Sequence, residues 1–236
     1  ESIRRRNFDN SKSKSMKVLI TGHTHGVGKA ILENCPSDYE VKGISRATGH
    51  DLIKNLPDTL GFIKEYNPDI FFNNAWGQGA QNEIAIWWTR NQNLKEPRVM
   101  ITSGSVAGLK GLCDDEKDFY PGMPRLPYSE YGNAKRKLFL ENYMHWIMDT
   151  REIYWTDYVL GWVKTRITVP QGSEELLGNM KMLEPDYVAK RMWNDIKNEN
   201  YKNTFVVGMN NKRSGTEQER VMLMMKMLAE TQKVGL

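Results

Sequence analysis

Short apolar runs alternate with longer amphipathic segments along most of the chain. The short runs, rich in β-branched and aromatic residues, predict strands at 17–21, 40–45, 69–73, 98–103, 153–159 and 204–207. The longer segments predict helices at 27–34, 58–66, 80–94, 131–149, 185–198 and 216–231. The strand candidates are apolar nearly throughout, as is typical of a parallel sheet covered on both faces. With right-handed crossovers, this alternation predicts an α/β fold, a doubly wound parallel sheet in a single domain.

Residues 1–15 differ from the rest because they are polar and show no periodicity. They predict a flexible basic N-terminal extension, followed by one domain over 16–236 with Met16 as a plausible natural start. The formal net charge is +4, and the basic residues of this extension account for much of the excess. The remaining chain is close to neutral, which disfavours nucleic acid as a partner.

Two cysteines, Cys35 and Cys113, are too few and too far apart to suggest a disulfide framework or a zinc site. They predict a reducing, cytoplasmic compartment and no bound metal. The longest apolar runs are short and interrupted, which predicts neither a membrane span nor a signal peptide.

Three glycines follow the first predicted strand, in the stretch TGHTHGVG at residues 21–28. In an open parallel sheet, the turn after the first strand is the usual phosphate site. Glycines let the backbone approach a pyrophosphate, and the next helix offers free N–H groups and a positive dipole end. The spacing is G-x-x-x-G-x-G rather than G-x-G-x-x-G, and a merely tight turn is the alternative interpretation.

The end of the second predicted strand indicates which dinucleotide such a turn would hold. Ile44-Ser45-Arg46 contains no acid to accept from a ribose 2′-hydroxyl, whereas Arg46 can pair with a 2′-phosphate. His25, inside the glycine turn, can add partial positive charge at the same corner. These residues favour NADP(H) over NAD(H), with an ordinary solvated arginine as the alternative interpretation of Arg46.

Several motifs, taken in order, resemble those of the short-chain dehydrogenase/reductase family from about residue 16 to about residue 208. They are Thr21-Gly22-x-x-x-Gly26-x-Gly28, Asp51-Leu52 after strand two, Asn73-Asn74-Ala75 at the family's fourth strand, Gly104-Ser105-Val106-Ala107-Gly108 at its fifth, Tyr131-x-x-x-Lys135, Leu160-Gly161-Trp162-Val163-Lys164-Thr165 and Glu184-Pro185-Asp186-Tyr187-Val188-Ala189. The resemblance implies a Rossmann-like fold. It also implies cofactor-binding roles for Thr21, Gly22, His25, Gly26, Val27, Gly28, Arg46, Asp51, Leu52, Asn74, Ala75, Tyr131, Lys135, Gly161, Val163 and Thr165.

The Tyr131-x-x-x-Lys135 spacing places both side chains on one face of a helix. Free tyrosine titrates near pH 10, so proton transfer near neutrality requires a stabilised phenolate, and each unit of pKa lowering corresponds to about 1.4 kcal/mol. Lys135 is expected to supply that charge and to hold the nicotinamide ribose, while Ser105 polarises the substrate carbonyl. Ser103 is the rival of Ser105, whereas Tyr128 has no lysine at the corresponding position.

Two departures from the family's motifs lie near the expected cofactor. Trp76 stands where the family has the last glycine of N-N-A-G, and its ring is expected to crowd the cofactor or rearrange the following loop. The helix at 80–94 looks shortened. The family's supporting catalytic asparagine therefore has Asn82 as its nearest candidate, with Asn91 and Asn93 as rivals.

Other positions around the expected substrate are open to two interpretations. Thr165 is expected to cap the segment that holds the nicotinamide carboxamide. The alternative interpretation is an ordinary threonine in a turn. Leu160 replaces the proline of P-G, which should soften that turn. Arg125, in an insert at 110–130, binds an anionic substrate or is solvated. Met180 and Met182 suit an adaptable apolar wall.

Together these features predict an NADP(H)-dependent enzyme that interconverts an alcohol and a carbonyl by hydride transfer, acting on a small-molecule carbonyl or alcohol. A sugar-nucleotide epimerase or dehydratase is one alternative, favoured by the wide separation of Ser105 and Tyr131. A non-catalytic dinucleotide-sensing protein is another, favoured by Trp76. The resemblance also implies pairing through the helices at 80–94 and 131–149, as a homodimer or homotetramer.

Overall fold

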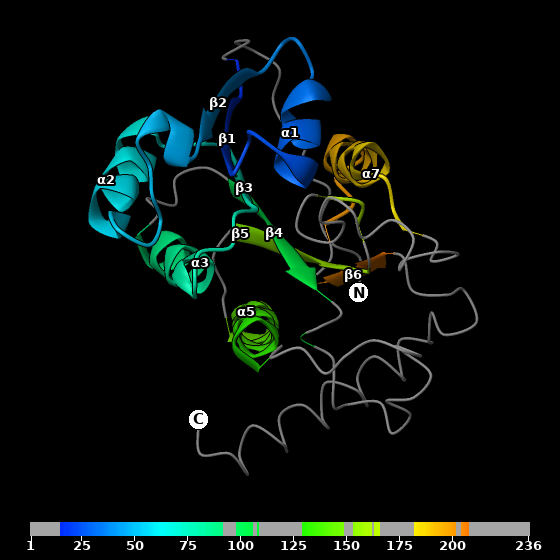
Figure 1. Ribbon diagram of the computed structural model, residues 1–236. Coiled ribbons are helices and arrows are strands. Elements are labelled where there is room, and N and C mark those ends of the chain that lie inside the picture. Colours follow the sequence, from blue (N-terminus) through cyan, green and yellow to red (C-terminus); the bar gives the residue numbers. More distant parts are fainter. Residues whose placement is uncertain are drawn as a thin grey trace, which may run out of the picture.

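The computed structural model describes residues 15–91, 98–105, 108, 129–148, 153–161, 163–165, 182–201 and 204–207. Its strands are β1 (Lys17–Thr21), β2 (Glu40–Ile44), β3 (Ile70–Asn73), β4 (Arg98–Ser105), β5 (Ile153–Leu160) and β6 (Thr204–Val207). Within this described part they form one parallel sheet in the order β2-β1-β3-β4-β5-β6. The predicted α/β fold with a doubly wound parallel sheet is confirmed (Figure 1).

The helices also follow the sequence pattern closely. They are α1 (Gly26–Glu33), α2 (Leu56–Tyr66), α3 (Ala80–Asn91), α5 (Ser129–Met148) and α7 (Pro185–Lys197), with a 3-10 turn η1 (Arg46–Thr48) after β2. The predicted helix at 216–231 and nearly all of the predicted extension at 1–15 lie outside the described residues. In the described part of the chain, no helix is long and apolar enough to cross a membrane.

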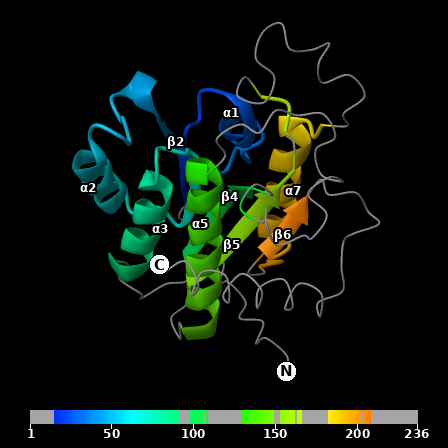
Figure 2. The same ribbon diagram turned by 60° about the horizontal axis from the view of Figure 1, so that its bottom comes forward.

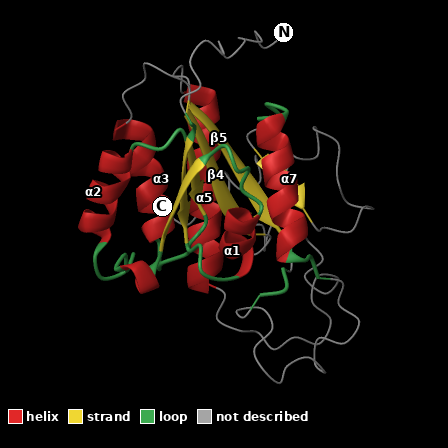
Figure 3. Cartoon of the chain, turned by 90° about the horizontal axis from the view of Figure 1, so that it is seen from above, coloured by secondary structure: helices red, strands yellow, loops and turns green. Residues whose placement is uncertain are grey.

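Each face of the sheet has its own hydrophobic core. Figure 3 shows α2 and α3 on one side of the strands and α7 on the other, and in Figure 1 α5 lies on the side of α3 and α1 on the side of α7. Neighbouring strand residues alternate between the two cores: Leu19 and Phe71 pack with α2, α3 and α5, whereas Ile20 and Phe72 pack with α1 and α7. All four side chains are fully buried. Because a strand turns successive side chains to opposite faces, covering both faces requires the continuous apolar runs seen in the sequence.

The six strands agree with the hydrophobic pattern, but the sheet differs from the family resemblance in one respect. The Asn73-Asn74-Ala75 motif follows β3 and the Ser105 segment ends β4, whereas the resemblance placed them after a fourth and a fifth strand. Between β2 and β3 the chain forms only η1, a turn and α2, and β2 is the edge of the described sheet. The motifs therefore occupy the expected end of the sheet with one strand fewer before them.

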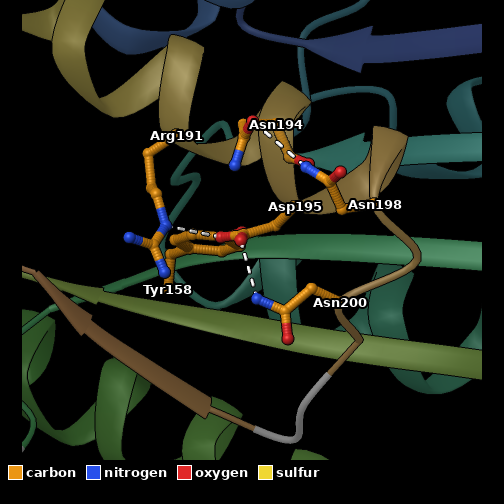
Figure 4. A network of polar contacts seen from close by, with 6 residues as sticks. All are labelled: Tyr158, Arg191, Asn194, Asp195, Asn198 and Asn200. Carbon is orange, nitrogen blue, oxygen red and sulfur yellow. Dashed lines mark hydrogen bonds and ion pairs between the residues drawn. The ribbon is translucent and has the colours of Figure 1, made fainter.

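A buried carboxylate fastens α7 to the strands beneath it. Asp195, 3% exposed, accepts hydrogen bonds from Tyr158 Oη at 2.8 Å, Arg191 Nε at 2.7 Å and Asn200 Nδ2 at 2.9 Å (Figure 4). Burial and the Asp195 contact raise the pKa of Tyr158 above its ordinary value, so this phenol stays a neutral donor. The network joins the end of α7 to β5, and so supports the strand that borders the candidate site.

Asp195→Ala should lower the free energy of unfolding by about 2–4 kcal/mol, because three donors lose their acceptor and one of them, Tyr158, is fully buried. Urea denaturation followed by circular dichroism measures the change. Asp186→Ala is the matched control, since this acid of the same helix is exposed and, among the described residues, contacts the exposed Lys190 and the half-buried Asn34. A loss no larger in Asp195→Ala than in Asp186→Ala would contradict the importance of the network.

Candidate active site

The glycine turn brings backbone close to backbone at the end of β1. Gly22 has φ +72° and donates its N–H to Ile44 O at 2.8 Å, and Gly26 has φ +54° at the start of α1. Both angles lie in the left-handed region that favours glycine. At Gly28, an added Cβ would lie 2.2 Å from Gly22 O, so the first turn of α1 packs directly on the β1 turn. The N–H groups at the start of α1 have no partner within the helix and are suited to hold an anion.

Thr21 ties this turn to the loop after β3. Its buried hydroxyl accepts the N–H groups of Asn74 and Ala75, each at 2.9 Å, and Asn74 Nδ2 donates to Thr21 O at 3.2 Å. Ser103 Oγ donates to Asn74 Oδ1 at 2.8 Å and extends the connection to β4. The residues predicted to bind a cofactor at Thr21, Asn74 and Ala75 therefore lie together at the carboxyl ends of β1 and β3, where parallel sheets bind ligands.

The predicted adenosine end of the site is open to solvent. Arg46 is exposed at the start of η1, and its guanidinium forms no hydrogen bond or ion pair within the described part of the chain. His25 is exposed and its Nδ1 lies 2.9 Å from Thr24 Oγ1. Asp51 uses one carboxylate oxygen to accept the N–H groups of the next turn, at 3.0 Å from Ile53 and 3.3 Å from Lys54. The adjoining Leu52 is buried beside the loop after β3.

The three residues of the predicted catalytic set meet where α5 crosses the end of β4. Figure 2 shows α5 running along the sheet beside α3. Tyr131 lies in the first turn of α5 and forms a side-chain hydrogen bond with Ser105 at the end of β4. Lys135 is one turn further on and is 4% exposed, with Nζ 5.4 Å from the centroid of the Tyr131 ring. Ser103, the rival of Ser105, uses its hydroxyl on Asn74 instead.

The pKa of Tyr131 differs from the sequence-based expectation. The Lys135 charge was expected to lower it, but burial raises the pKa of Tyr131 in this structure, and the Ser105 hydrogen bond opposes that rise only in part. Burial also lowers the pKa of Lys135 to about 8. The physical reason is desolvation, which disfavours both the phenolate and the ammonium. The ammonium moreover donates to Gln81 Oε1 and Ser103 O, each at 2.6 Å.

Gln81 is a contact of Lys135 that the sequence did not predict. Its Nε2 donates to Asn73 O at 2.6 Å, which aims Oε1 at the Lys135 ammonium. The neighbouring Asn82, predicted as the supporting asparagine, instead donates Nδ2 to Ala134 O at 2.9 Å and joins α3 to α5. Asn91 bonds to Trp87 O on its own helix, and Asn93 lies outside the described residues. No motif distinguishes Gln81, because its role depends on how α3 packs on α5.

Trp76 lies directly against Tyr131, the predicted catalytic tyrosine. The two ring centroids are 5.2 Å apart, with an interplanar angle of 80°, an edge-to-face arrangement. The Trp76 side chain is 41% exposed. The backbone just before it is fixed, because the Ala75 N–H donates to the Thr21 hydroxyl. The bulky residue in place of the family's glycine therefore packs on the ring of Tyr131.

The last predicted cofactor segment approaches the glycine turn from the other side. Gly161 N–H donates to Val207 O at 2.8 Å, and Val163 forms a bridge with Leu183. The Thr165 side chain lies beside Gly26, because a Cβ added there would be 3.1 Å from Thr165 Cγ2. Leu160, in place of proline, continues β5 and is buried. The predicted positions Arg125, Tyr128 and Met180 lie outside the described residues.

No protein-family model matches the sequence, and no curated protein matches it either. Several solved structures, however, are similar to the fold of this chain. A short-chain dehydrogenase from Burkholderia cenocepacia J2315 in complex with NADP superposes with a TM-score of 0.60 at 14% identity, over 83% of this chain and 96% of that one. The 3-alpha-hydroxysteroid dehydrogenase of a Pseudomonas species, complexed with NADH, gives a TM-score of 0.59 at 16% identity, over 81% of this chain and 94% of that one.

A third structure, the 3-ketoacyl-(acyl-carrier-protein) reductase of Brucella melitensis complexed with NADH, gives a TM-score of 0.58 at 12% identity, over 83% of this chain and 98% of that one. The chain thus has the Rossmann-like fold of the short-chain dehydrogenases and reductases. The family resemblance seen in the sequence is confirmed at the level of the fold.

Proposed function

We propose that the protein is an NADP(H)-dependent oxidoreductase of the short-chain dehydrogenase/reductase type, interconverting an alcohol and a carbonyl. The observation that carries this proposal is the meeting of Ser105, Tyr131 and Lys135 beside the glycine turn, at the carboxyl end of the sheet. An ordered set of motifs brought to one place by the fold is more specific than any of its members.

The described residues fit a dinucleotide. The tight packing of Gly28 on Gly22 O sets the start of α1 directly against the end of β1, where the first N–H groups of the helix are suited to hold a pyrophosphate. An ammonium has three N–H donors, of which Gln81 and Ser103 accept two, so within the described part of the chain one donor of Lys135 is left for a ribose hydroxyl. When bound, the nicotinamide supplies or accepts the hydride.

The chain's own residues would position the substrate and move the proton. Ser105 donates a hydrogen bond to the substrate carbonyl oxygen and polarises it. Tyr131, within hydrogen-bond reach of Ser105, gives its phenolic proton to the oxygen as negative charge develops there. Lys135, held by Gln81 and Ser103, stabilises the phenolate that remains. In the direction of alcohol oxidation the same phenolate takes the proton back.

Solved structures of this fold contain either NADP or NADH, so the choice of cofactor rests on Arg46. Arg46→Ala should weaken NADPH binding by about tenfold to a hundredfold and leave NADH binding nearly unchanged, because a paired charged hydrogen bond contributes about 1.5–3 kcal/mol. Calorimetric titration of both proteins with both nucleotides measures the preference. Lys54→Ala, an exposed cation of the following turn, is the control. Equal NADPH affinity in Arg46→Ala and the wild-type protein would contradict the assignment.

A non-catalytic dinucleotide-sensing protein is the second candidate, favoured by the Trp76 ring that packs on Tyr131. A screen of aldehydes and ketones for NADPH oxidation tests the choice. The oxidoreductase is expected to consume NADPH with at least one carbonyl class. Tight NADPH binding with no consumption across aliphatic, aromatic, sugar and acyl carbonyls would favour the sensor.

The proposed enzyme acts in the cytoplasm, which agrees with its low cysteine content. It pairs as a homodimer or homotetramer through α3 and α5. Three exposed apolar side chains near the end of α5, Met144, Ile147 and Met148, support such pairing.

A further inference from the structure

A second buried carboxylate lies directly behind the catalytic set. Asp157, in the middle of β5, is fully buried and accepts the Thr102 hydroxyl on Oδ1 at 2.6 Å. Its Oδ2 has no hydrogen-bond partner among the described residues. A Cβ added at Gly104 would lie 2.4 Å from Oδ2, so the carboxylate occupies the space that the glycine leaves open. Asp157 therefore lies beneath the strand end that carries Ser103 and Ser105.

Asp157 and Lys135 are each other's charged neighbours. In the described part of the chain, the groups whose charges act on this pair come from two elements: Tyr131 and Lys135 on α5 and Asp157 on β5. From α3, the neutral Gln81 side chain contacts Lys135. From β4, the neutral Ser103 carbonyl contacts Lys135 and the neutral Thr102 hydroxyl contacts Asp157. Both charged groups are fully buried, and a buried charge is costly unless an opposite charge offsets it.

The two charges coexist only within a limited pH range. Burial raises the pKa of Asp157 to about 6, and the Thr102 hydrogen bond, the Lys135 charge and the Gly104 backbone oppose this rise only in part. Burial lowers the pKa of Lys135 to about 8, while Asp157 acts in the opposite direction and favours the ammonium. Between these values both are ionised. Below about pH 6 Asp157 becomes neutral, and above about pH 8 Lys135 does.

We propose that Asp157 is a positioning residue that keeps Lys135 in its charged form beneath Tyr131. This role rests on the proposed function, since it matters for catalysis only if Lys135 stabilises the Tyr131 phenolate. Asp157 also acts on Tyr131 directly, and there its charge disfavours the phenolate. Loss of Asp157 therefore favours the Tyr131 phenolate directly, but disfavours it indirectly because Lys135 loses its charge more readily. The decisive measurement must therefore follow the ionisation of Lys135 itself.

The test is the titration of Lys135 by NMR in protein labelled with ¹³C at the lysine ε-carbons, with Lys135→Met identifying its signal. The wild-type midpoint is expected near pH 8. In Asp157→Asn the midpoint should fall by about one unit or more, as expected when an opposite charge nearby is removed. Asp195→Asn is the matched control, because Asp195 is equally buried but bonds to Tyr158 and Arg191 on the other face. A midpoint that does not move in Asp157→Asn, or moves as far in Asp195→Asn, would overturn the proposal.

Thr102→Val provides a second variant if Asp157→Asn does not fold. Asp157 stays in place but loses the hydrogen bond that lowers its pKa. The Lys135 signal should show a smaller second inflection near pH 6 in the wild-type protein, and this inflection should move to higher pH in Thr102→Val. An unchanged inflection would show that Lys135 does not sense Asp157.

The pH dependence of carbonyl reduction separates this proposal from the proposed function. In Asp157→Asn the alkaline loss of kcat should begin at lower pH, in step with the Lys135 midpoint, whereas Asp195→Asn should keep the wild-type profile. Carbonyl reduction with an unmoved Lys135 midpoint would overturn the role of Asp157 alone. A moved midpoint in a protein that reduces no carbonyl would support the coupling and overturn the proposed function.

Discussion

Tyr131→Phe should reduce the rate of carbonyl reduction by about 10²–10⁴-fold while leaving NADPH affinity nearly unchanged. The substitution removes the phenolic proton and its hydrogen bond to Ser105, but keeps the ring that packs edge-to-face on Trp76. Steady-state kinetics with NADPH, together with a calorimetric titration, measure both effects. The loss should appear in kcat, because the phenolic proton is transferred only in the chemical step.

Tyr143→Phe is the matched control for this experiment, since Tyr143 lies on the same helix nearer its far end. This variant should retain wild-type turnover. Turnover in Tyr131→Phe within a few-fold of the wild-type value would show that another group supplies the proton, and would remove Tyr131 from the mechanism. Loss of NADPH binding in the same variant would instead indicate a structural role for the hydroxyl.

Gly28→Ala should abolish measurable dinucleotide binding and destabilise the fold by about 1–3 kcal/mol, as expected for overpacking. The added methyl group would lie 2.2 Å from Gly22 O and 2.8 Å from Asn74 Nδ2. Relief of this contact requires the backbone of the glycine turn to move, which separates the start of α1 from the end of β1. The N–H groups that would hold a pyrophosphate then no longer point to one place.

Gly61→Ala is the control for Gly28→Ala. Gly61 also lies in a helix, α2, but a Cβ added there meets no atom within 4 Å. Alanine should therefore leave nucleotide binding intact and stabilise the protein by about 0.5–1 kcal/mol, the usual gain over glycine inside a helix. Thermal unfolding in the presence and absence of NADPH compares the two variants. Wild-type NADPH affinity in Gly28→Ala would contradict the assignment of this turn as the cofactor site.

The sequence predicted most of the fold because the central strands β1, β3, β4 and β5 are buried on both faces. Leu19 and Ile20 point to different cores, and such continuous apolar runs separated by helical segments are typical of one architecture. The hydrophobic pattern predicted no strand between 40–45 and 69–73, in agreement with the structure, whereas the family motifs implied one strand more, because motifs indicate the order of elements and not their number. The position of Trp76 beside the site was anticipated from its place in the N-N-A motif.

The electrostatics of the site could not be predicted in the same way. The contact of Gln81 with Lys135 depends on the packing of α3 on α5. Asp157 faces Lys135 only because β5 lies next to β4, and nothing in its local sequence distinguishes it from an ordinary strand residue. For the same reason the expected lowering of the Tyr131 pKa was wrong: motif spacing indicates which charges are near, but not how deeply they are buried.

Calorimetric titration of the purified protein with NADPH and with NADH tests the central claim most directly, because it requires no knowledge of the substrate. The glycine turn and Arg46 predict saturable binding of one NADPH per chain, tighter than the binding of NADH. Absence of binding by either nucleotide would contradict the cofactor site. It would then indicate a Rossmann-like fold in which the Trp76 ring, packed on Tyr131, excludes the nucleotide.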